Sequence, residues 1–272
     1  MEHRYASDCH NHSACSPDGK DTVERMCRQA AELGLYAYTL TDHCECQEYE
    51  SRYRPRVRKA WGEMERARDS FSGKFRFYRG IELGQPNQDL PAAEQALSQG
   101  EYDFVIGSIH NIRGFEDFFF LDYTREGPEF IDRLLSAYWQ ELLEVIRWGG
   151  FDSLGHLTYP LRYIVGDHGI PVELTRHREQ IDGVFRALIR AEKALEVNTS
   201  GLRQKIGRTL PDLPLLARYH ELGGRLVTLG SDAHRAEDLG KGVDEGMELL
   251  KQAGFREFAV YEKRKPTLLP LE

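Results

Sequence analysis

The sequence predicts an α/β fold in which parallel β-strands form a barrel and helices follow most of the strands. Short apolar runs rich in β-branched and aromatic residues alternate along the 272 residues with longer segments of helical period. Several helical segments are followed at once by a glycine, such as Gly34 or Gly149, which is a typical helix stop signal. Seven such strands are too many for a small flavodoxin-like sheet and suit a barrel.

The predicted elements follow one another regularly from the N-terminus. Apolar runs of β-type composition predict strands at Arg4–Cys9, Tyr36–Thr41, Phe75–Leu83, Tyr102–Ile109, Phe151–Leu154, Ala194–Asn198 and Arg225–Gly230, with a late strand near Glu257–Tyr261. Helical periodicity predicts helices at Thr22–Leu33, Val57–Ser70, Glu129–Trp148, Arg178–Ala191, Leu213–Leu222 and Ala236–Ala253. No repeat, low-complexity segment or flexible linker divides the chain, so we expect residues 1–272 to form a single domain.

The composition argues against several classes of protein. Acidic residues outnumber basic ones by 44 to 36, and the formal charge of −8 disfavours a nucleic-acid binder or a basic membrane-surface protein. We find neither the apolar segment of a signal peptide nor a run near the roughly 18 apolar residues of a membrane helix. Five cysteines, an odd number, are more typical of a reducing compartment than of a disulfide framework. We therefore expect a cytoplasmic protein, and no feature indicates an oligomeric state.

Histidines and carboxylates gather where the predicted strands end. These ends read Asp8-Cys9-His10-Asn11-His12, Thr41-Asp42-His43, Gly80-Ile81-Glu82, Gly107-Ser108-Ile109-His110, Gly155-His156 and Gly230-Ser231-Asp232-Ala233-His234, and Asp18 lies six residues beyond His12. In a parallel α/β barrel the C-terminal ends of the strands open on one face, where active sites are built. We therefore expect these side chains to lie together.

This gathering predicts a metal site. Side chains two positions apart on a strand point to the same side, so His10 and His12 can face a common ion. Imidazoles with carboxylates are ligands of Zn, Mn and Fe, whereas a calcium site needs no histidine. One such histidine alone would more often be an ordinary core or surface residue, but independent placement of six is improbable. The nine candidate ligands exceed what one ion accepts, so we expect more than one ion.

The spaced motifs resemble those of the PHP (polymerase and histidinol phosphatase) family. The motifs that carry the resemblance are His10-x-His12, Thr41-Asp42-His43, Gly80-Ile81-Glu82, Ser108-Ile109-His110 and Ser231-Asp232-Ala233-His234. They extend from about Asp8 to His234, which is nearly the whole chain. The resemblance implies a distorted (β/α)7 barrel, similar to a TIM barrel, with a trinuclear metal cluster at the C-terminal face of its strands.

The resemblance also implies a ligand set for each of three divalent transition-metal ions, which would be Zn, Mn or Fe. The first ion would be held by His10, His12, Glu82 and Asp232, the second by Glu82 as a bridge with His110 and His156, and the third by Asp18, His43 and His234. Some relatives have a histidine in place of Asp18, so the identity of the third ion is left open.

Within the family the chain most resembles the monofunctional histidinol-phosphate phosphatases, whose length it matches. The resemblance implies that two arginines, Arg162 after Gly155-His156-Leu157 and Arg203 after the strand that contains Glu196, clamp the substrate phosphate. Arginine suits this role because its planar fork donates two parallel hydrogen bonds to two oxygens. The alternative is that both arginines are ordinary surface residues.

The implied reaction is hydrolysis of L-histidinol phosphate to L-histidinol and phosphate, a step of histidine biosynthesis. We expect Glu82, Asp232 and His234 to serve catalysis, with Glu82 bridging two ions that share a hydroxide nucleophile and a water near His234 assisting the leaving group. Ser231 could orient Asp232 or reach the phosphate, or it could be a small residue required by packing. Asp42 is expected to support a metal-bound histidine rather than to bind metal itself.

Other functions stay open on the sequence alone. The same chemistry could act on another phosphate ester, such as a nucleotide or a phosphotyrosyl protein. A metal-dependent amidohydrolase also begins with His-x-His, but no lysine lies at a predicted strand end to bridge its metals. A non-catalytic PHP module would tend to lose ligands. The aromatic segment Phe115–Phe120 could be a lid on the imidazole, with Glu116 or Asp117 near the amine, or it could be core.

Overall fold

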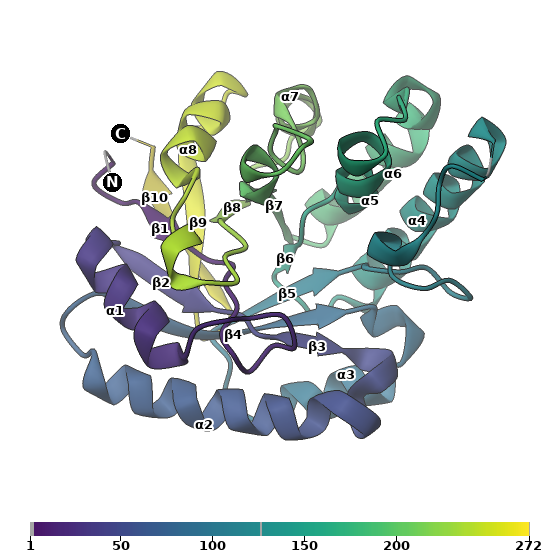
Figure 1. Cartoon of the computed structure of the whole chain (residues 1–272). Helices are drawn as coiled ribbons and strands as arrows, with labels where there is room; N and C mark the ends of the chain where they lie inside the picture. Colours follow the sequence, from purple (N-terminus) through teal and green to yellow (C-terminus); the bar gives the residue numbers. More distant parts are fainter. Residues whose placement is uncertain (1–2, 126, 272) are drawn as a thin grey trace.

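The computed structural model describes residues 3–125 and 127–271, and a nearly closed barrel of parallel strands forms its centre (Figure 1). The strands follow the order β1-β2-β4-β5-β6-β7-β8, and each neighbouring pair is parallel. Their bounds are β1 Ser7–Asp8, β2 Ala37–Leu40, β4 Arg76–Gly84, β5 Phe104–Ser108, β6 Ser153–Leu154, β7 Ala194–Asn198 and β8 Val227–Gly230. The short strand β3, His43–Glu45, continues the β2 side of β4. The predicted α/β barrel is confirmed.

A few main-chain hydrogen bonds join the first and last strand segments of the barrel. The N–H of Cys9 donates to the carbonyl of Leu229 at 2.9 Å, and the N–H of Asp232 donates to the carbonyl of His10 at 2.8 Å. Asn11 and Ala233 form one further parallel bridge. Because this pairing continues beyond the ends of β1 and β8, it brings the two loops that follow these strands side by side.

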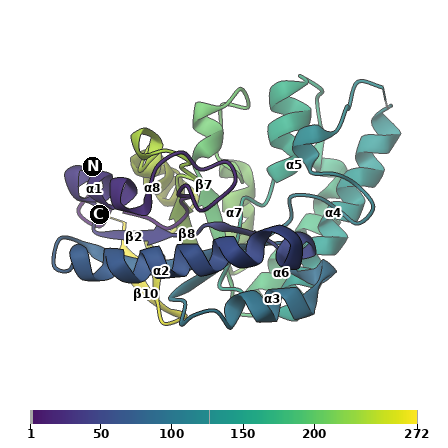
Figure 2. The same cartoon turned by 60° about the horizontal axis from the view of Figure 1, so that its bottom comes forward.

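Helices surround the barrel and cover its outer face (Figures 1 and 2). Their bounds are α1 Val23–Leu33, α2 Arg54–Ser70, α3 Leu90–Leu97, α4 Pro128–Trp148, α5 Tyr159–Leu161, α6 Arg178–Arg190, α7 Leu213–Glu221 and α8 Val243–Gln252. Helix α1 illustrates the agreement with the sequence pattern. It begins after Thr22, whose hydroxyl accepts a hydrogen bond from the N–H of Arg25, and it ends before Gly34. Its buried residues recur every three or four positions, as the periodicity predicts.

The structure departs from the predicted elements mainly where elements are short. Strand β3 and helix α3 were not predicted, and neither was β10, Lys265–Pro270. The predicted helix Ala236–Ala253 begins only at Val243. The preceding Gly240 and Gly242 both adopt positive φ angles, of 74° and 80°, and a right-handed helix cannot pass through that conformation.

A C-terminal hairpin covers the N-terminal end of the barrel. It consists of β9, Glu257–Glu262, and β10, which pair in antiparallel fashion. At its turn, the N–H of Lys263 donates to Asp103 at 3.1 Å, and the side chain of Arg264 pairs with Asp152. Asp103 and Asp152 immediately precede β5 and β6, so the hairpin lies at the end where these strands begin. The opposite end is left to the loops that carry the motifs.

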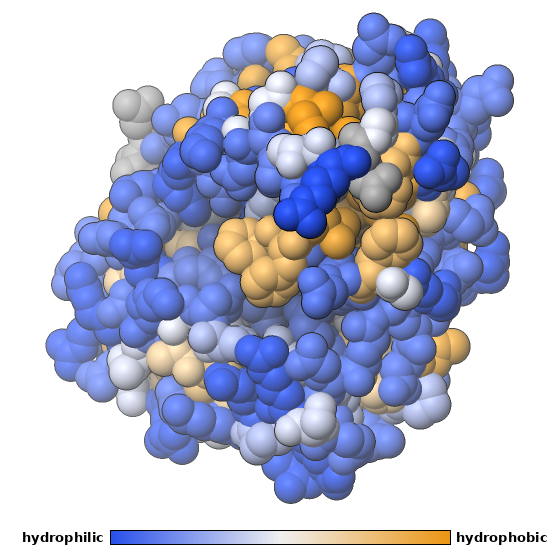
Figure 3. Space-filling view, turned by 45° about the vertical axis from the view of Figure 1, so that its right-hand side comes forward, coloured by the Kyte–Doolittle hydropathy of each residue, from blue (hydrophilic) through white to orange (hydrophobic). Residues whose placement is uncertain are grey.

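The barrel strands are buried along almost their whole length. Every residue of β2, β5, β7 and β8 is buried, as in a parallel sheet covered on both faces. On the side of α4 and α5, the molecular surface is mainly hydrophilic, with apolar side chains near the centre of the view and toward its top (Figure 3). Among the described residues, none of the helices combines the length and the apolarity of a membrane span.

Candidate metal centre

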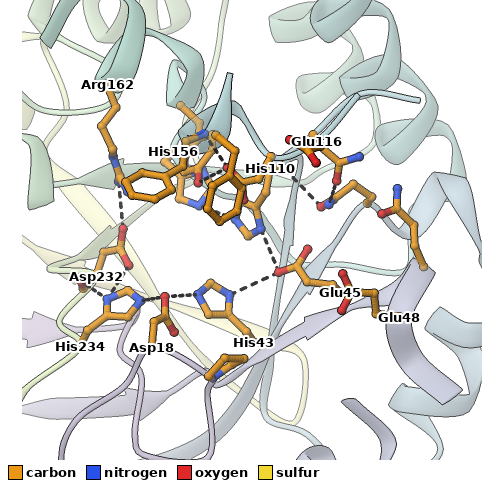
Figure 4. A pocket seen from close by; sticks show the side chains of 18 of the residues that line it. Asp18, His43, Glu45, Glu48, His110, Glu116, His156, Arg162, Asp232 and His234 are labelled. Carbon is orange, nitrogen blue, oxygen red and sulfur yellow. Dashed lines mark hydrogen bonds and ion pairs between the residues drawn. The ribbon is translucent and has the colours of Figure 1, made fainter. Parts of the chain in front are cut away.

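The motif residues converge at the C-terminal ends of the barrel strands, around a cavity of about 820 Å³ (Figure 4). Six of the nine predicted ligands line this cavity: Asp18, His43, His110, His156, Asp232 and His234. The other three, His10, His12 and Glu82, are buried beneath it. Arg162 lies beside Asp232 at one side of the cavity, and Glu45, Glu48 and Glu116 lie toward the other.

Four of the predicted ligands, His10, His12, Glu82 and Asp232, face one point. The Nε2 atom of His12 lies 3.3 Å from Oδ1 of Asp232 and 3.6 Å from Oε2 of Glu82. The Nε2 atom of His10 lies 3.4 Å from the same Glu82 oxygen and 3.8 Å from the same Asp232 oxygen. Four atoms bound at 2.0–2.1 Å to a tetrahedral ion would be about 3.3–3.4 Å apart. The observed spacing therefore fits a common ion.

Two backbone features place His10 and Asp232 in this group. Gly230 ends β8 directly beside His10, and a Cβ atom at Gly230 would collide with that of His10. Asp232 adopts a φ angle of 54°, in the left-handed region that residues other than glycine seldom occupy. Such conformations persist where the surrounding structure enforces them, and they cluster at functional sites. The sequence Gly230-Ser231-Asp232 at the end of β8 thus allows the loop after β8 to lie close to the loop after β1.

Glu82 joins this group to a second one. Its Oε1 atom lies 2.9 Å from Nε2 of His156 and 3.2 Å from Nε2 of His110, while the two imidazole nitrogens are 3.4 Å apart. Its other oxygen, Oε2, faces His10 and His12. A fully buried carboxylate between two sets of imidazoles is placed to bridge two ions.

The remaining predicted ligands, Asp18, His43 and His234, form a third group nearer the solvent. The Oδ2 atom of Asp18 lies 3.0 Å from Nε2 of His234 and 3.7 Å from Nε2 of His43. The other ring nitrogen of His43, Nδ1, lies 2.6 Å from Oε2 of Glu82. His43 therefore connects this group to the buried ones. The structure brings all nine predicted ligands into one continuous cluster.

Several buried polar atoms in this cluster lack hydrogen bonds within the part of the chain that the structure describes. They are Nε2 of His10, Nε2 of His12, Nδ1 of His43 and Oε2 of Glu82, the last two lying 2.6 Å apart but outside hydrogen-bond geometry. Leaving one buried polar group unsatisfied costs about 1–3 kcal/mol, so four such atoms at one place need a physical explanation. Lone pairs that face one another at these distances match the ligands of a shared cation. The residues present fit a transition-metal cluster.

The histidines of the cluster differ in ionisation: neighbouring carboxylates outweigh burial and raise the pKa of His10, His43 and His110, whose protons a metal ion would displace. Burial lowers the pKa of both His12 and His156, which keeps these imidazoles neutral with a lone pair to donate. Burial would by itself raise the pKa of Glu82, but the neighbouring His43 and His10 outweigh it and hold this pKa well below the usual value. Neutral imidazoles and an ionised carboxylate are the forms that bind metal.

Two carboxylates that the sequence analysis did not select support these histidines. Glu196, on β7, places Oε1 at 2.5 Å from Nδ1 of His10 and accepts the main-chain N–H of His156 at 2.6 Å. Glu45, on β3, places Oε1 at 3.0 Å from Nδ1 of His110. Because Nδ1 is engaged in each case, Nε2 is directed to the cluster. The signal that could have found Glu196 is its position near the C-terminal end of a predicted strand.

Asp42 and Ser231 are buried, and neither side chain lines the cavity. Asp42 accepts the hydroxyl of Ser16 at 2.7 Å, and that hydroxyl lies 3.4 Å from Nδ1 of His12, so Asp42 supports His12 through Ser16. The fully buried Ser231 donates its hydroxyl to Asp8 at 2.5 Å and does not line the cavity. Of its alternative roles, the structure favours packing and orientation of the loop over contact with phosphate.

The two predicted phosphate-binding arginines occupy different places. Arg162 lines the cavity and donates to Oδ2 of Asp232 at 3.0 Å and to the hydroxyl of Ser200 at 2.8 Å. Arg203 donates to the carbonyls of Ser231, at 2.7 Å, and of Lys241, at 3.3 Å, and it does not line the cavity. An anion in the cavity would therefore contact Arg162. Arg203 instead connects its own loop to the segment that contains Ser231 and Lys241.

The aromatic segment Phe115–Phe120 combines the two roles that the sequence left open. Phe118 is fully buried and packs edge-to-face against Tyr138 and Tyr159. Phe119 and Phe120 are 61% and 69% exposed, and both line the cavity. The segment therefore anchors itself in the core through one ring and presents the next two at the rim.

Fold and site together define a class of protein. Imidazoles and carboxylates able to hold divalent ions form the floor of the cavity, and a guanidinium stands in its wall. Such ions polarise esters and activate water, while a guanidinium binds an anionic oxygen. A barrel that carries metal-binding side chains and an arginine on its C-terminal face has the features of a metal-dependent hydrolase.

Comparison with known families gives the particular group. The family model described as the PHP domain matches residues 8–200, and the chain belongs to this family. The resemblance inferred from the motifs is confirmed.

Individual relatives match the chain over almost its whole length. It is 31% identical over 261 residues to the "Probable histidinol-phosphatase" of Thermotoga maritima, covering 96% of this chain and 98% of the relative. It is 28% identical over 265 residues to the "Histidinol-phosphatase" of Lactococcus lactis, covering 95% of each. The crystal structure of histidinol phosphate phosphatase from Lactococcus lactis, complexed with Zn, L-histidinol and phosphate, matches with a TM-score of 0.77 at 26% identity, covering 96% of this chain and 98% of that one. The predicted PHP-type (β/α)7 barrel is confirmed.

Proposed function

We propose that the chain hydrolyses L-histidinol phosphate to L-histidinol and phosphate. Its likeness to histidinol-phosphatases over nearly the whole of both chains identifies it as an enzyme and supports this reaction. The observation in this structure that carries the proposal is the meeting of nine imidazole and carboxylate side chains beneath a cavity that Arg162 lines. The substrate of this site would be a small phosphate monoester.

We propose that three divalent ions occupy the three groups of side chains. The ligands would be His10, His12, Glu82 and Asp232 for the first ion, Glu82, His110 and His156 for the second, and Asp18, His43 and His234 for the third. Zn is the ion held by the solved relative, and Mn and Fe also accept imidazole and carboxylate ligands. When bound, such ions supply a water activated at neutral pH and neutralise the phosphoryl oxygens.

The chain's own side chains would bind and orient the ester. Arg162 keeps one buried N–H, on Nε, without a partner in the described chain, and this group can donate to a phosphate oxygen. Glu82, Asp232 and His234 remain the catalytic residues that we propose, because Glu82 joins the metal groups and the other two line the cavity. Arg203 and Ser231 would act by holding the loop that carries Asp232.

We also propose that the enzyme works in the cytoplasm. All five cysteines are free thiols, although Cys44 and Cys46 are close neighbours in sequence. Unpaired cysteines are typical of a reducing compartment, where histidinol phosphate would be processed as a small metabolite.

A substrate panel tests the proposed function. Enzyme loaded with Zn, Mn or Fe is assayed on L-histidinol phosphate, a nucleoside monophosphate, p-nitrophenyl phosphate and a phosphotyrosyl peptide. We expect kcat/KM for L-histidinol phosphate to exceed the others by roughly 100-fold or more, because binding energy away from the reacting bond raises specificity. Comparable values across unrelated esters would refute the proposed substrate. Failure of a metal-containing protein to hydrolyse any ester would refute the phosphatase activity itself.

A further inference from the structure

One wall of the cavity, formed by Asp117, Phe119, Tyr159 and Tyr163, combines a carboxylate with aromatic rings. Oδ1 of Asp117 accepts the main-chain N–H of Phe119 at 2.8 Å and the hydroxyl of Tyr159 at 3.2 Å. The hydroxyl of Tyr163 donates to that of Tyr159 at 2.9 Å, and the rings of Phe119 and Tyr163 meet edge-to-face with centroids 5.7 Å apart. Because all four residues line the cavity, a ligand there would meet the carboxylate and the rings together.

No lysine or arginine in the described part of the protein serves as a counter-ion to Asp117. Arg125, in the same loop, pairs instead with Asp122 at 2.8 Å. Both hydrogen bonds to Asp117 use Oδ1, which leaves Oδ2 available to a ligand. Burial raises the pKa of Asp117, and the charge of His110, which pairs instead with Glu45 and Glu82, offsets this rise only in part. A cation entering the cavity would supply that counter-ion.

The rings beside Asp117 are unusually exposed. Phe115, Phe119 and Phe120 account for three of the five exposed large apolar side chains among the described residues. They line the cavity, and apolar side chains gather in a patch on this side of the molecule (Figure 3). Contiguous exposed apolar groups mark binding sites more often than chance, and aromatic faces attract organic cations. The aromatic rim therefore suits the same kind of ligand as the carboxylate.

Tyr159 links this wall to the phosphate end of the cavity. The guanidinium carbon of Arg162 lies 5.0 Å from the centroid of the Tyr159 ring, and the rings of His110 and His156 lie 5.0 and 4.9 Å away. The hydroxyl at the far end of the same ring meets Asp117. The ring of Tyr159 thus contacts both Asp117 and the arginine that we propose to bind phosphate. A small ester with a cationic group a few bonds from phosphorus can reach both.

We propose that Asp117, flanked by Phe119 and Tyr163, binds the ammonium group of the substrate and selects esters that carry one. The inference rests on the proposed function, since it takes for granted a phosphate monoester at the metal centre. It defines the substrate class as phosphates of small amino alcohols, with the amine on the carbon next to the ester carbon. The ammonium donates to Oδ2 of Asp117 in a charge-assisted hydrogen bond, and an ester without the amine leaves the carboxylate unpaired.

The variant Asp117→Asn tests this role with little other change. Asparagine keeps an Oδ1 acceptor for the N–H of Phe119 and the hydroxyl of Tyr159, while it removes the charge and replaces the acceptor Oδ2 with an amide NH2 group. Zn-loaded enzyme is assayed on two pairs of esters that differ in the amine alone. The pairs are L-histidinol phosphate with its deamino analogue, and 2-aminoethyl phosphate with ethyl phosphate.

We expect Asp117→Asn to lower kcat/KM for the amine-bearing esters by about 10- to 100-fold, as loss of a charge-assisted hydrogen bond predicts. The value of kcat/KM for the amine-free esters should change by less than about twofold. Asp122→Asn is the matched control, because Asp122 lies in the same loop, is exposed and does not line the cavity. We expect Asp122→Asn to leave kcat/KM unchanged for both esters of each pair.

Equal losses for both members of a pair would overturn the proposal, because Asp117 would then act through the structure of the loop. Unchanged values for both would overturn it as well. Phe119→Leu, at an exposed position, should lower the same preference by about twofold to fivefold and serves if Asp117→Asn does not fold.

Failure of the proposed function is a separate result. If wild-type enzyme does not hydrolyse L-histidinol phosphate, the aminoethyl and ethyl esters still decide the role of Asp117. Calorimetric binding of these two esters gives the same comparison without turnover. A preference for the amine that Asp117→Asn abolishes supports the subsite, and the absence of any preference in the wild type refutes it.

Discussion

Glu196 holds the imidazole of His10 through a contact of 2.5 Å between its Oε1 atom and Nδ1 of the ring. Its second oxygen accepts the main-chain N–H of His156 at 2.6 Å. Glu196 is itself buried, so its two contacts are sheltered from water. One carboxylate therefore orients a histidine from each of the two buried groups, and it leaves Nε2 of His10 facing Glu82 and Asp232.

We expect Glu196→Gln to weaken metal binding about 10- to 100-fold, the usual effect of losing a carboxylate that orients a metal-bound histidine. The amide keeps the shape of the side chain but can accept hydrogen bonds with only one of its two polar atoms. Metal retained after dialysis against graded chelator, together with kcat/KM, measures the effect. The exposed Glu173→Gln serves as control. Wild-type metal retention in Glu196→Gln would contradict this role.

Glu82→Gln and His110→Ala should both abolish phosphatase activity, with losses of roughly 10³-fold or more in kcat. Glu82 lies between the two buried groups of imidazoles, and His110 faces it at 3.2 Å, so either change disrupts the shared ligand set. Metal analysis should show fewer ions per chain, while circular dichroism should show an intact fold. The metal assignment would be wrong if folded His110→Ala bound no metal yet kept wild-type turnover.

The barrel and the convergence of the nine candidate side chains could be predicted because both depend on patterns within short segments. The two-residue period of a strand is enough to put His10 and His12 on one side, and the alternation of strands with helices is enough to put every strand end on one face. The distances of 3.3 to 3.8 Å among His10, His12, Glu82 and Asp232 agree with that prediction.

The supporting contacts could not be predicted because they join segments far apart in the sequence. Glu196 lies 186 residues from His10, and Glu45 lies 65 residues from His110. Arg203 follows a strand on the correct face, yet its guanidinium turns to two main-chain carbonyls. Which way such a side chain points depends on the conformation of its loop, and no periodicity encodes that.

Lysine substitutions should separate the two arginines. Arg162→Lys keeps the charge beside Asp232 but loses the planar fork, so we expect the inhibition constant of phosphate to rise about 10-fold and kcat/KM to fall about as much. Arg203→Lys should change both by less than about threefold while lowering the melting temperature, because it weakens contacts between loops. A rise in the phosphate inhibition constant as large for Arg203→Lys as for Arg162→Lys would show that Arg203 contacts the substrate.

Chelation should stop hydrolysis and also destabilise the protein. Without metal, the buried atoms of His10, His12 and Glu82 stay unpaired, so bound ions favour the folded state. Each ion at about 100 times its dissociation constant contributes about 2.7 kcal/mol, which corresponds to a rise of roughly 5–10 °C in melting temperature. Mass spectrometry of the reloaded native protein should find three ions per chain, and a smaller number at full activity would contradict the trinuclear site.

A further prediction concerns stability away from the site, where Asp182 of α6 and Arg218 of α7 form an ion pair with two hydrogen bonds. Nη2 of Arg218 lies 2.6 Å from Oδ2 of Asp182, and Nε lies 2.9 Å from Oδ1. These hydrogen bonds to Arg218 lower the pKa of Asp182 in the folded protein. A carboxylate with a depressed folded pKa stabilises the protein above its unfolded pKa of about 3.9, and this contribution is lost as the pH falls through the folded value.

Asp182→Asn should therefore lower the free energy of unfolding at pH 7, and the difference from wild type should shrink as the pH falls below about 4. The reason is that the wild-type protein loses the ionised carboxylate over this range, whereas the variant has none to lose. Urea unfolding at pH 7, 4 and 2.5 measures the difference, with the exposed Asp69→Asn as the matched control. A difference that stays constant down to pH 2.5 would show that the side chain contributes through packing, since only the charged form of Asp182 responds to pH in this way.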